Sequence, residues 1–147
     1  MKSETRYPSN VFWSWRKYLQ AELPNATIFY NPPSIPKPSG NEWLIFTLGS
    51  YRAGIITWIT SRITCVTRND SDGSDLMSLV TTVLGKVDST TAGRGSIAFY
   101  DKTTANIIGT IYITDTSVAT VVPEGNGITS CAIDIYTRAK TKRNIHA

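Results

Sequence analysis

The chain has 147 residues, of which 41% are hydrophobic and 18% are charged. This length suits one ordinary domain, and the charged fraction is low for a soluble protein. Two cysteines and one histidine are too few for a structural zinc site, and no apolar stretch approaches the roughly 20 residues of a membrane-spanning helix. The opening residues, MKSETRYPSN, have no apolar core, so we expect no signal peptide and synthesis in the cytoplasm.

The net charge of +4 is placed unevenly along the chain. Its whole excess equals four basic residues near the C-terminus: Arg138, Lys140, Lys142 and Arg143. We therefore predict a neutral domain over residues 1–137 and a basic C-terminal tail over residues 138–147 that contacts an anionic partner. Truncation after Tyr136 should then leave a folded protein.

Residues 9–23 have the pattern of an amphipathic helix. Apolar side chains recur every four positions from Val11 to Leu23, which places them on one helix face. Ser9 can cap the first turn, and Pro24 ends the helix.

Three strands should follow this helix, because the next apolar runs are rich in β-branched and aromatic residues. These runs lie at 26–30, 42–50 and 51–69. Gly54 marks a bend at the start of the third run. Residues 31–40, NPPSIPKPSG, contain four prolines, which excludes a helix or a central strand. We expect a stiff, exposed loop or arm there, with Lys37 available to a partner.

The acidic segment NDSDGSD (69–75) joins the third strand to the next helix. A calcium-binding EF-hand loop with Gly73 at its sixth position would place Arg68 and Leu79 at positions that need acidic ligands. We therefore interpret the segment as a turn and helix start, in which Ser71, Asp72 or Ser74 caps the helix. An acidic contact surface for a basic partner is the alternative.

The second half of the chain repeats the order of a helix followed by strands. Residues 76–87 carry apolar side chains at helical spacing, and the polar loop 88–96 presents Arg94. Strands are predicted at 97–101, 106–116 and 128–138, with a turn at 123–127. Cys65 and Cys131 fall in apolar strand patterns, which favours two buried free thiols over a disulfide.

The order of helix, three strands, helix and three strands predicts an α+β fold. We expect a mainly antiparallel or mixed β-sheet with two α-helices packed on one face. A long strand or hairpin and the proline-rich loop complete it.

No catalytic motif is present. The sequence has no GxSxG elbow, and AGRGS (92–96) lacks the spacing of a phosphate-binding P-loop. The only histidine, His146, is next to the last residue. We expect no enzymatic activity, no cofactor and no metal.

Nucleic-acid binding is the runner-up hypothesis. The basic tail can contact phosphates, and four tryptophans can in principle stack on bases. Trp15, Trp43 and Trp58 lie in helix or strand patterns, however, so we predict that they pack in the core. The alternative function is a small β-rich protein that binds single-stranded nucleic acid.

The chain resembles the tail terminator proteins of long-tailed bacteriophages. The resemblance rests on four segments in the same order: NVFWSWRKYLQAEL, EWLIFTLGS, RITCVTRNDSDGSDLMSLVTTVLGKV and CAIDIYTR. It implies a hexameric ring that caps the tail tube, ends its polymerisation and joins the tail to the head, with DNA passing through the pore. The implied partners are further copies of the chain, the tail tube protein and a head-completion or connector protein, and the implied location is the virion tail. Another connector, a head-closure protein or a tube protein is the nearest alternative.

Overall fold

The computed structural model describes residues 8–52, 56–88 and 95–141. Their secondary structure comprises two helices and seven strands. The elements in chain order are α1 (Pro8–Glu22), β1 (Ile28–Tyr30), β2 (Glu42–Arg52), β3 (Thr57–Arg68), α2 (Ser74–Val87), β4 (Ser96–Tyr100), β5 (Ile107–Val118), β6 (Val122–Gly125) and β7 (Ile128–Thr141).

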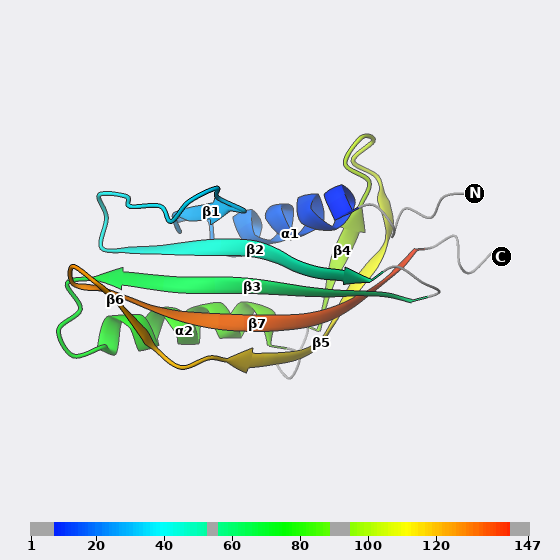
Figure 1. The fold of residues 1–147 in the computed structure, drawn as a ribbon. Helices are drawn as coiled ribbons and strands as arrows, with labels where there is room; N and C mark the ends of the chain where they lie inside the picture. Colours follow the sequence, from blue (N-terminus) through cyan, green and yellow to red (C-terminus); the bar gives the residue numbers. More distant parts are fainter. Residues whose placement is uncertain (1–7, 53–55, 89–94, 142–147) are drawn as a thin grey trace.

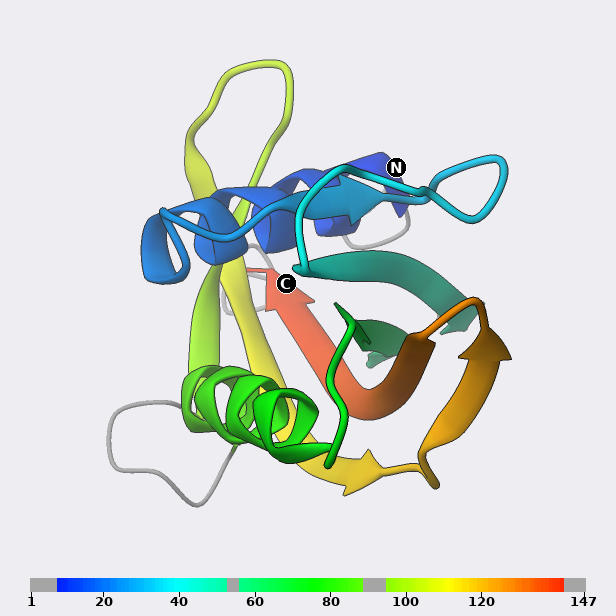
Figure 2. The same cartoon turned by 90° about the vertical axis from the view of Figure 1, so that its left-hand side faces the viewer.

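The strands form one mixed sheet in the order β1-β2-β3-β7-β5-β4, with β6 paired to β7. Only the pair β1 and β2 is parallel, and every other pair within the described residues is antiparallel. The long strands β2, β3 and β7 run side by side (Figure 1), and the sheet is curled (Figure 2). Both helices pack against one face of it. The predicted α+β class is therefore confirmed.

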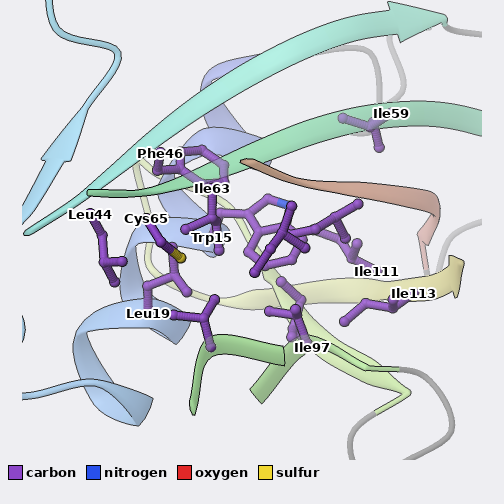
Figure 3. Packing of buried hydrophobic residues seen from close by; sticks show 14 of the residues in the cluster. Trp15, Leu19, Leu44, Phe46, Ile59, Ile63, Cys65, Ile97, Ile111 and Ile113 are labelled. Carbon is purple, nitrogen blue, oxygen red and sulfur yellow. The ribbon is translucent and has the colours of Figure 1, made fainter. Parts of the chain in front are cut away.

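The core lies between that face and the helices (Figure 3). Apolar residues of α1 and α2 share it with those of β2, β3, β4, β5 and β7. Its largest fully buried side chains include Trp15, Phe46 and Phe99. Cys65 and Cys131 are directly opposite each other on β3 and β7 and are both buried and free, as predicted.

Helix α1 also covers the outer edge of β4. The buried hydroxyl of Ser14 donates to the carbonyl of Asn10 and accepts the backbone N–H of Tyr100 at 2.8 Å. The side-chain oxygen of Asn10 accepts the backbone N–H of Lys102 at 3.0 Å. Since an open edge strand offers unpaired N–H groups to other chains, these bonds protect the edge.

The boundary between the second and third predicted strands was wrong. Tyr51 and Arg52 continue β2 past a register shift between Leu48 and Tyr51, and β3 begins at Thr57. The predicted bend at Gly54 lies outside the described residues.

The predicted tail boundary was also wrong. Strand β7 continues to Thr141, so residues 138–141 belong to the sheet. Thr137, Ala139 and Thr141 alternate inward and are almost fully buried. The segment 137–141 is thus a paired part of the sheet with a buried face, and a truncation after Tyr136 would remove part of the fold.

The start of α2 differs in detail from the expectation. Gly73 is the N-cap residue, with φ of 78°, and makes no side-chain cap bond. The capping group is the carboxylate of Asp70, which accepts the backbone N–H groups of Asp75 at 3.2 Å and Leu76 at 2.8 Å. Asp72 accepts from the N–H and the hydroxyl of Ser74, and these bonds lower its pKa.

Candidate functional site

A row of four large side chains crosses the sheet on the face opposite the helices. In the strand register, Arg52 of β2 is opposite Trp58 of β3, Trp58 is opposite Arg138 of β7, and Arg138 is opposite Tyr112 of β5. Their neighbours in sequence, such as Ile59, Ile111 and Ala139, point into the core. Because side chains alternate along a strand, the four residues share the outer face. We call them the basic–aromatic row.

The aromatic rings of this row remain exposed. Trp58 keeps 46% of its surface in solvent and Tyr112 keeps 37%, while Tyr136, two residues before Arg138 on the same face of β7, keeps 40%. Trp15 and Trp43, in contrast, are almost fully buried. The prediction that Trp58 packs in the core was therefore wrong, because no element among the described residues covers this part of the sheet.

The cations of the row have no acidic partner within the described residues. The guanidinium of Arg138 lies over the ring of Tyr112, with 5.4 Å between its central carbon and the ring centroid. This cation–π contact holds both side chains against the sheet. The Nε atom of Arg138 is buried and makes no hydrogen bond to another described residue. Lys140 follows on the same face, is exposed and is opposite Thr110.

One ion pair borders the row. Arg62 of β3 and Asp134 of β7 are opposite each other, with an Nε to Oδ1 distance of 2.7 Å and an Nη2 to Oδ2 distance of 3.3 Å. The hydrogen bond to Asp134 raises the pKa of Arg62. The charge of Asp134 is thus balanced by Arg62, and among the described residues Asp115 of β5, opposite Tyr136, is the other carboxylate near the row. With Arg52, Arg138 and Lys140 unpaired in the described part, the local balance is positive.

The proline-rich segment covers the opposite end of the outer face. Arg68 donates from Nη1 to the carbonyls of Pro38 at 2.8 Å and Gly40 at 3.0 Å. Its guanidinium also lies over the ring of Trp43, at 5.1 Å. A shallow pocket remains between the segment and β2, with Ile35 and Ile45 among its lining residues. The predicted arm is therefore fastened to the sheet at its C-terminal end.

The six predicted partner-contact residues fall into three groups. Arg138 and Lys140 lie together on the outer face of β7, as parts of a strand instead of a tail. Lys37 is exposed on the proline-rich segment, toward the other end of β2. The three others lie outside the described residues: Arg94, Lys142 and Arg143.

Sequence reasoning missed Arg52 and Tyr112 as site residues. Both alternate with residues that face the core, Tyr51 beside the first and Ile111 and Ile113 beside the second. That alternation is the feature of the sequence that could have indicated the two outward-facing residues. It is hard to recognise because Arg52 lies close to the boundary between two predicted strands and because Tyr112 lies in a mostly apolar run.

The remaining reactive side chains have no arrangement suited to catalysis. Burial, and then the neighbouring Cys131, raise the pKa of the Cys65 thiol to about 12. Its thiolate, the nucleophilic form, is therefore scarce at neutral pH. In the described ranges, no three His, Cys, Asp or Glu side chains are grouped to hold a metal ion. Neither of the described helices is long and apolar enough to cross a membrane.

Comparison with known proteins relates this chain to others by fold only. No family matches the sequence, and no curated protein matches it. Nineteen chains of solved structures match the fold. One of them, 9% identical in sequence, aligns with a TM-score of 0.57 over 92% of this chain and 96% of its own length. At that identity the likeness extends to the fold and not to function.

Proposed function

We propose that this protein is a structural subunit of a bacteriophage tail that caps the tail tube, ends its polymerisation and forms the ring joining tail to head. The proposal is supported by the positions that the four segments quoted for the resemblance occupy in the fold. They form α1, β2, the β3–turn–α2 unit and β7, and side chains from all of them meet in one core. These segments are thus the framework of the fold.

Exposed apolar side chains support an assembly of several copies. Val118, Val121 and Val122 keep between 42% and 48% of their surface in solvent at the corner between β5 and β6. The hairpin that connects β4 and β5 projects from the body (Figure 1), and Ile107, where β5 begins, is 48% exposed. A ring of identical subunits joins two different surfaces of each copy. The corner and the hairpin are separate surfaces that suit such a contact.

The proposal is tested by the mass and shape of the purified protein, alone and together with a tail tube protein from the same phage. Light scattering after size exclusion measures the mass, and negative-stain images show the shape. We expect rings with a central hole, or rings that form only on tube ends, together with tubes of limited length. Filaments of this chain would indicate a tube protein instead. A monomer that leaves tube length unchanged would refute the proposal.

A pair of matched variants separates assembly from folding. Val121→Asp combined with Val122→Asp places charges at the exposed corner, where they should abolish ring formation without changing the melting temperature by more than a few degrees. Ile35→Asp is the control, because Ile35 is 72% exposed on the proline-rich segment. Rings formed equally by both proteins would exclude the corner as the contact.

A further inference from the structure

We propose that the basic–aromatic row binds single-stranded nucleic acid. Bases stack on Trp58 and Tyr112, while phosphates contact Arg52, Arg138 and Lys140. The inference rests on the uncovered sheet face alone and does not require the protein to form a ring.

The spacing of the row suits a polymer that alternates bases and phosphates. Neighbouring strands lie about 4.8 Å apart, so a cation and a ring alternate at that interval over roughly 14 Å from Arg52 to Tyr112. Lys140 extends the positive charge by about 7 Å along β7. Each ring of the row thus has a cation beside it. A single-stranded nucleic acid that lies across the β-strands therefore meets a ring for its bases and a cation for its phosphates in turn.

The side chains are already ordered for this contact. Arg138 is half-buried and is held over Tyr112 by the cation–π contact, so binding loses less side-chain freedom than it would for a free arginine. Its guanidinium makes no ion pair with a described carboxylate, so an incoming phosphate oxygen can accept from the guanidinium. Arginine forms such bonds to phosphate in a planar, bidentate geometry.

Single strands fit this face better than duplex DNA or an acidic protein. In a duplex the base faces are stacked on one another, so only the cations would be used and the exposed rings would contribute nothing. The centre of a protein–protein interface is usually depleted of charge, whereas here each ring is flanked by a cation. Stacking on an aromatic side chain is open only to unpaired bases, so the two exposed rings should favour a single strand over a duplex.

The test measures fluorescence anisotropy with a labelled 12-residue oligothymidine, a duplex of equal length and polyglutamate as a competitor. We expect the single strand to bind more tightly than the duplex at low salt, and polyglutamate to compete poorly. Binding should quench tryptophan fluorescence, since Trp58 stacks on a base. Absence of binding at low salt, equal binding of duplex, or equal competition by polyglutamate would overturn the proposal.

Substitutions then assign the contact to the row. Trp58→Ala should weaken binding by about 5- to 150-fold, as the loss of one stacked base implies, and Trp58→Phe should restore part of it. Arg138→Gln should reduce the salt dependence, lowering the slope of log K against log salt by about 0.7. Lys37→Gln is the control, because it removes one exposed cation far from the row. Unchanged binding by Trp58→Ala with an unchanged melting temperature would refute the assignment.

The two proposals fail separately. Rings seen by microscopy with no affinity for the oligonucleotide would leave the structural role standing and remove this one. Binding of the oligonucleotide by a monomer that never caps tubes would support nucleic-acid binding and refute the structural role.

Discussion

Truncation within β7 gives the sharpest test of the fold. A chain that ends at Tyr136 loses Thr137–Thr141, all of which pair with β5. Thr137, Arg138 and Ala139 pair with β3 as well. A chain that ends at Thr141 loses only residues 142–147. We expect the longer chain to fold and the shorter one to fail.

The expected loss of stability follows from the backbone hydrogen bonds that β7 makes with β3 on one side and β5 on the other. Removing its last five residues deletes roughly eight backbone hydrogen bonds, each worth about 0.5–1.5 kcal/mol net. The loss is thus about 4–12 kcal/mol, comparable to the total stability of about 5–15 kcal/mol of a small domain. It also exposes Ile59 and Ile111, which face the core beside the lost segment.

Circular dichroism during heating is a sufficient assay. The chain ending at Thr141 should melt cooperatively, within a few degrees of the full-length protein, because a free energy change below about 1 kcal/mol shifts the midpoint by only that much. The chain ending at Tyr136 should be insoluble or show no cooperative transition. A cooperative melt of the shorter chain close to that of the longer one would refute the reasoning. Point substitutions at Arg138 or Lys140, which leave the ladder intact, are therefore needed to test their contacts with a partner.

Four further substitutions test other parts of the structure. Gly109→Ala should be strongly destabilising, because its Cβ would lie 1.9 Å from a carbonyl oxygen of β7, whereas Gly85→Ala has open space and should stabilise α2 by about 0.5–1 kcal/mol; denaturant melts of both measure the contrast. Asp70→Ala should cost about 0.5–2 kcal/mol through loss of the α2 cap, and an equal stability of this variant and the wild type would show that the cap is formed elsewhere. The pKa of Cys65, raised from 9.0 to about 12, implies a stability contribution that is present below pH 9 and is lost as the pH rises toward 12, by up to about 4 kcal/mol. Comparison of unfolding free energies between pH 8 and 11 with those of Cys65→Ala should show a shallower decline in the variant, and parallel curves would contradict the assignment.

The patterns that depend on strong amphipathicity could be predicted from the sequence. Helix α2 is expected from residue 76 to 87 and spans Ser74–Val87, because its apolar residues recur on one face only. The helix predicted at 9–23 spans Pro8–Glu22 and is limited by Pro24, which cannot continue it. The two cysteines are expected to be buried free thiols and are so.

The errors arose where the buried residues are small and polar. In the segment from Thr137 to Thr141, the inward side chains are threonine and alanine and the outward ones are charged, so hydropathy alone does not distinguish a strand from a solvated tail. The cap of α2 was missed for a different reason. The left-handed backbone of Gly73 turns the chain so that Asp70 reaches the helix N-terminus, a geometry that cannot be read from spacing along the chain.

The position of the candidate site was the least predictable feature, because it depends on what covers each face. Strand β3 carries large side chains on both faces, with Ile59 and Ile63 on one and Trp58 on the other. Only the arrangement of the other elements decides which of them is exposed.

That arrangement leaves one part of the sheet uncovered. Helix α1 caps the edge of β4 through Ser14, and Asn31 accepts the backbone N–H of Leu48 beyond the end of β1. The helices cover one face, and the proline-rich segment covers one end of the other, where Trp43 is buried. Among the described residues, no element covers the end that carries Trp58 and Arg138. Three exposed rings, Trp58, Tyr112 and Tyr136, gather at this end, and exposed apolar surface of this kind often marks a binding site, so we expect a partner to bind here.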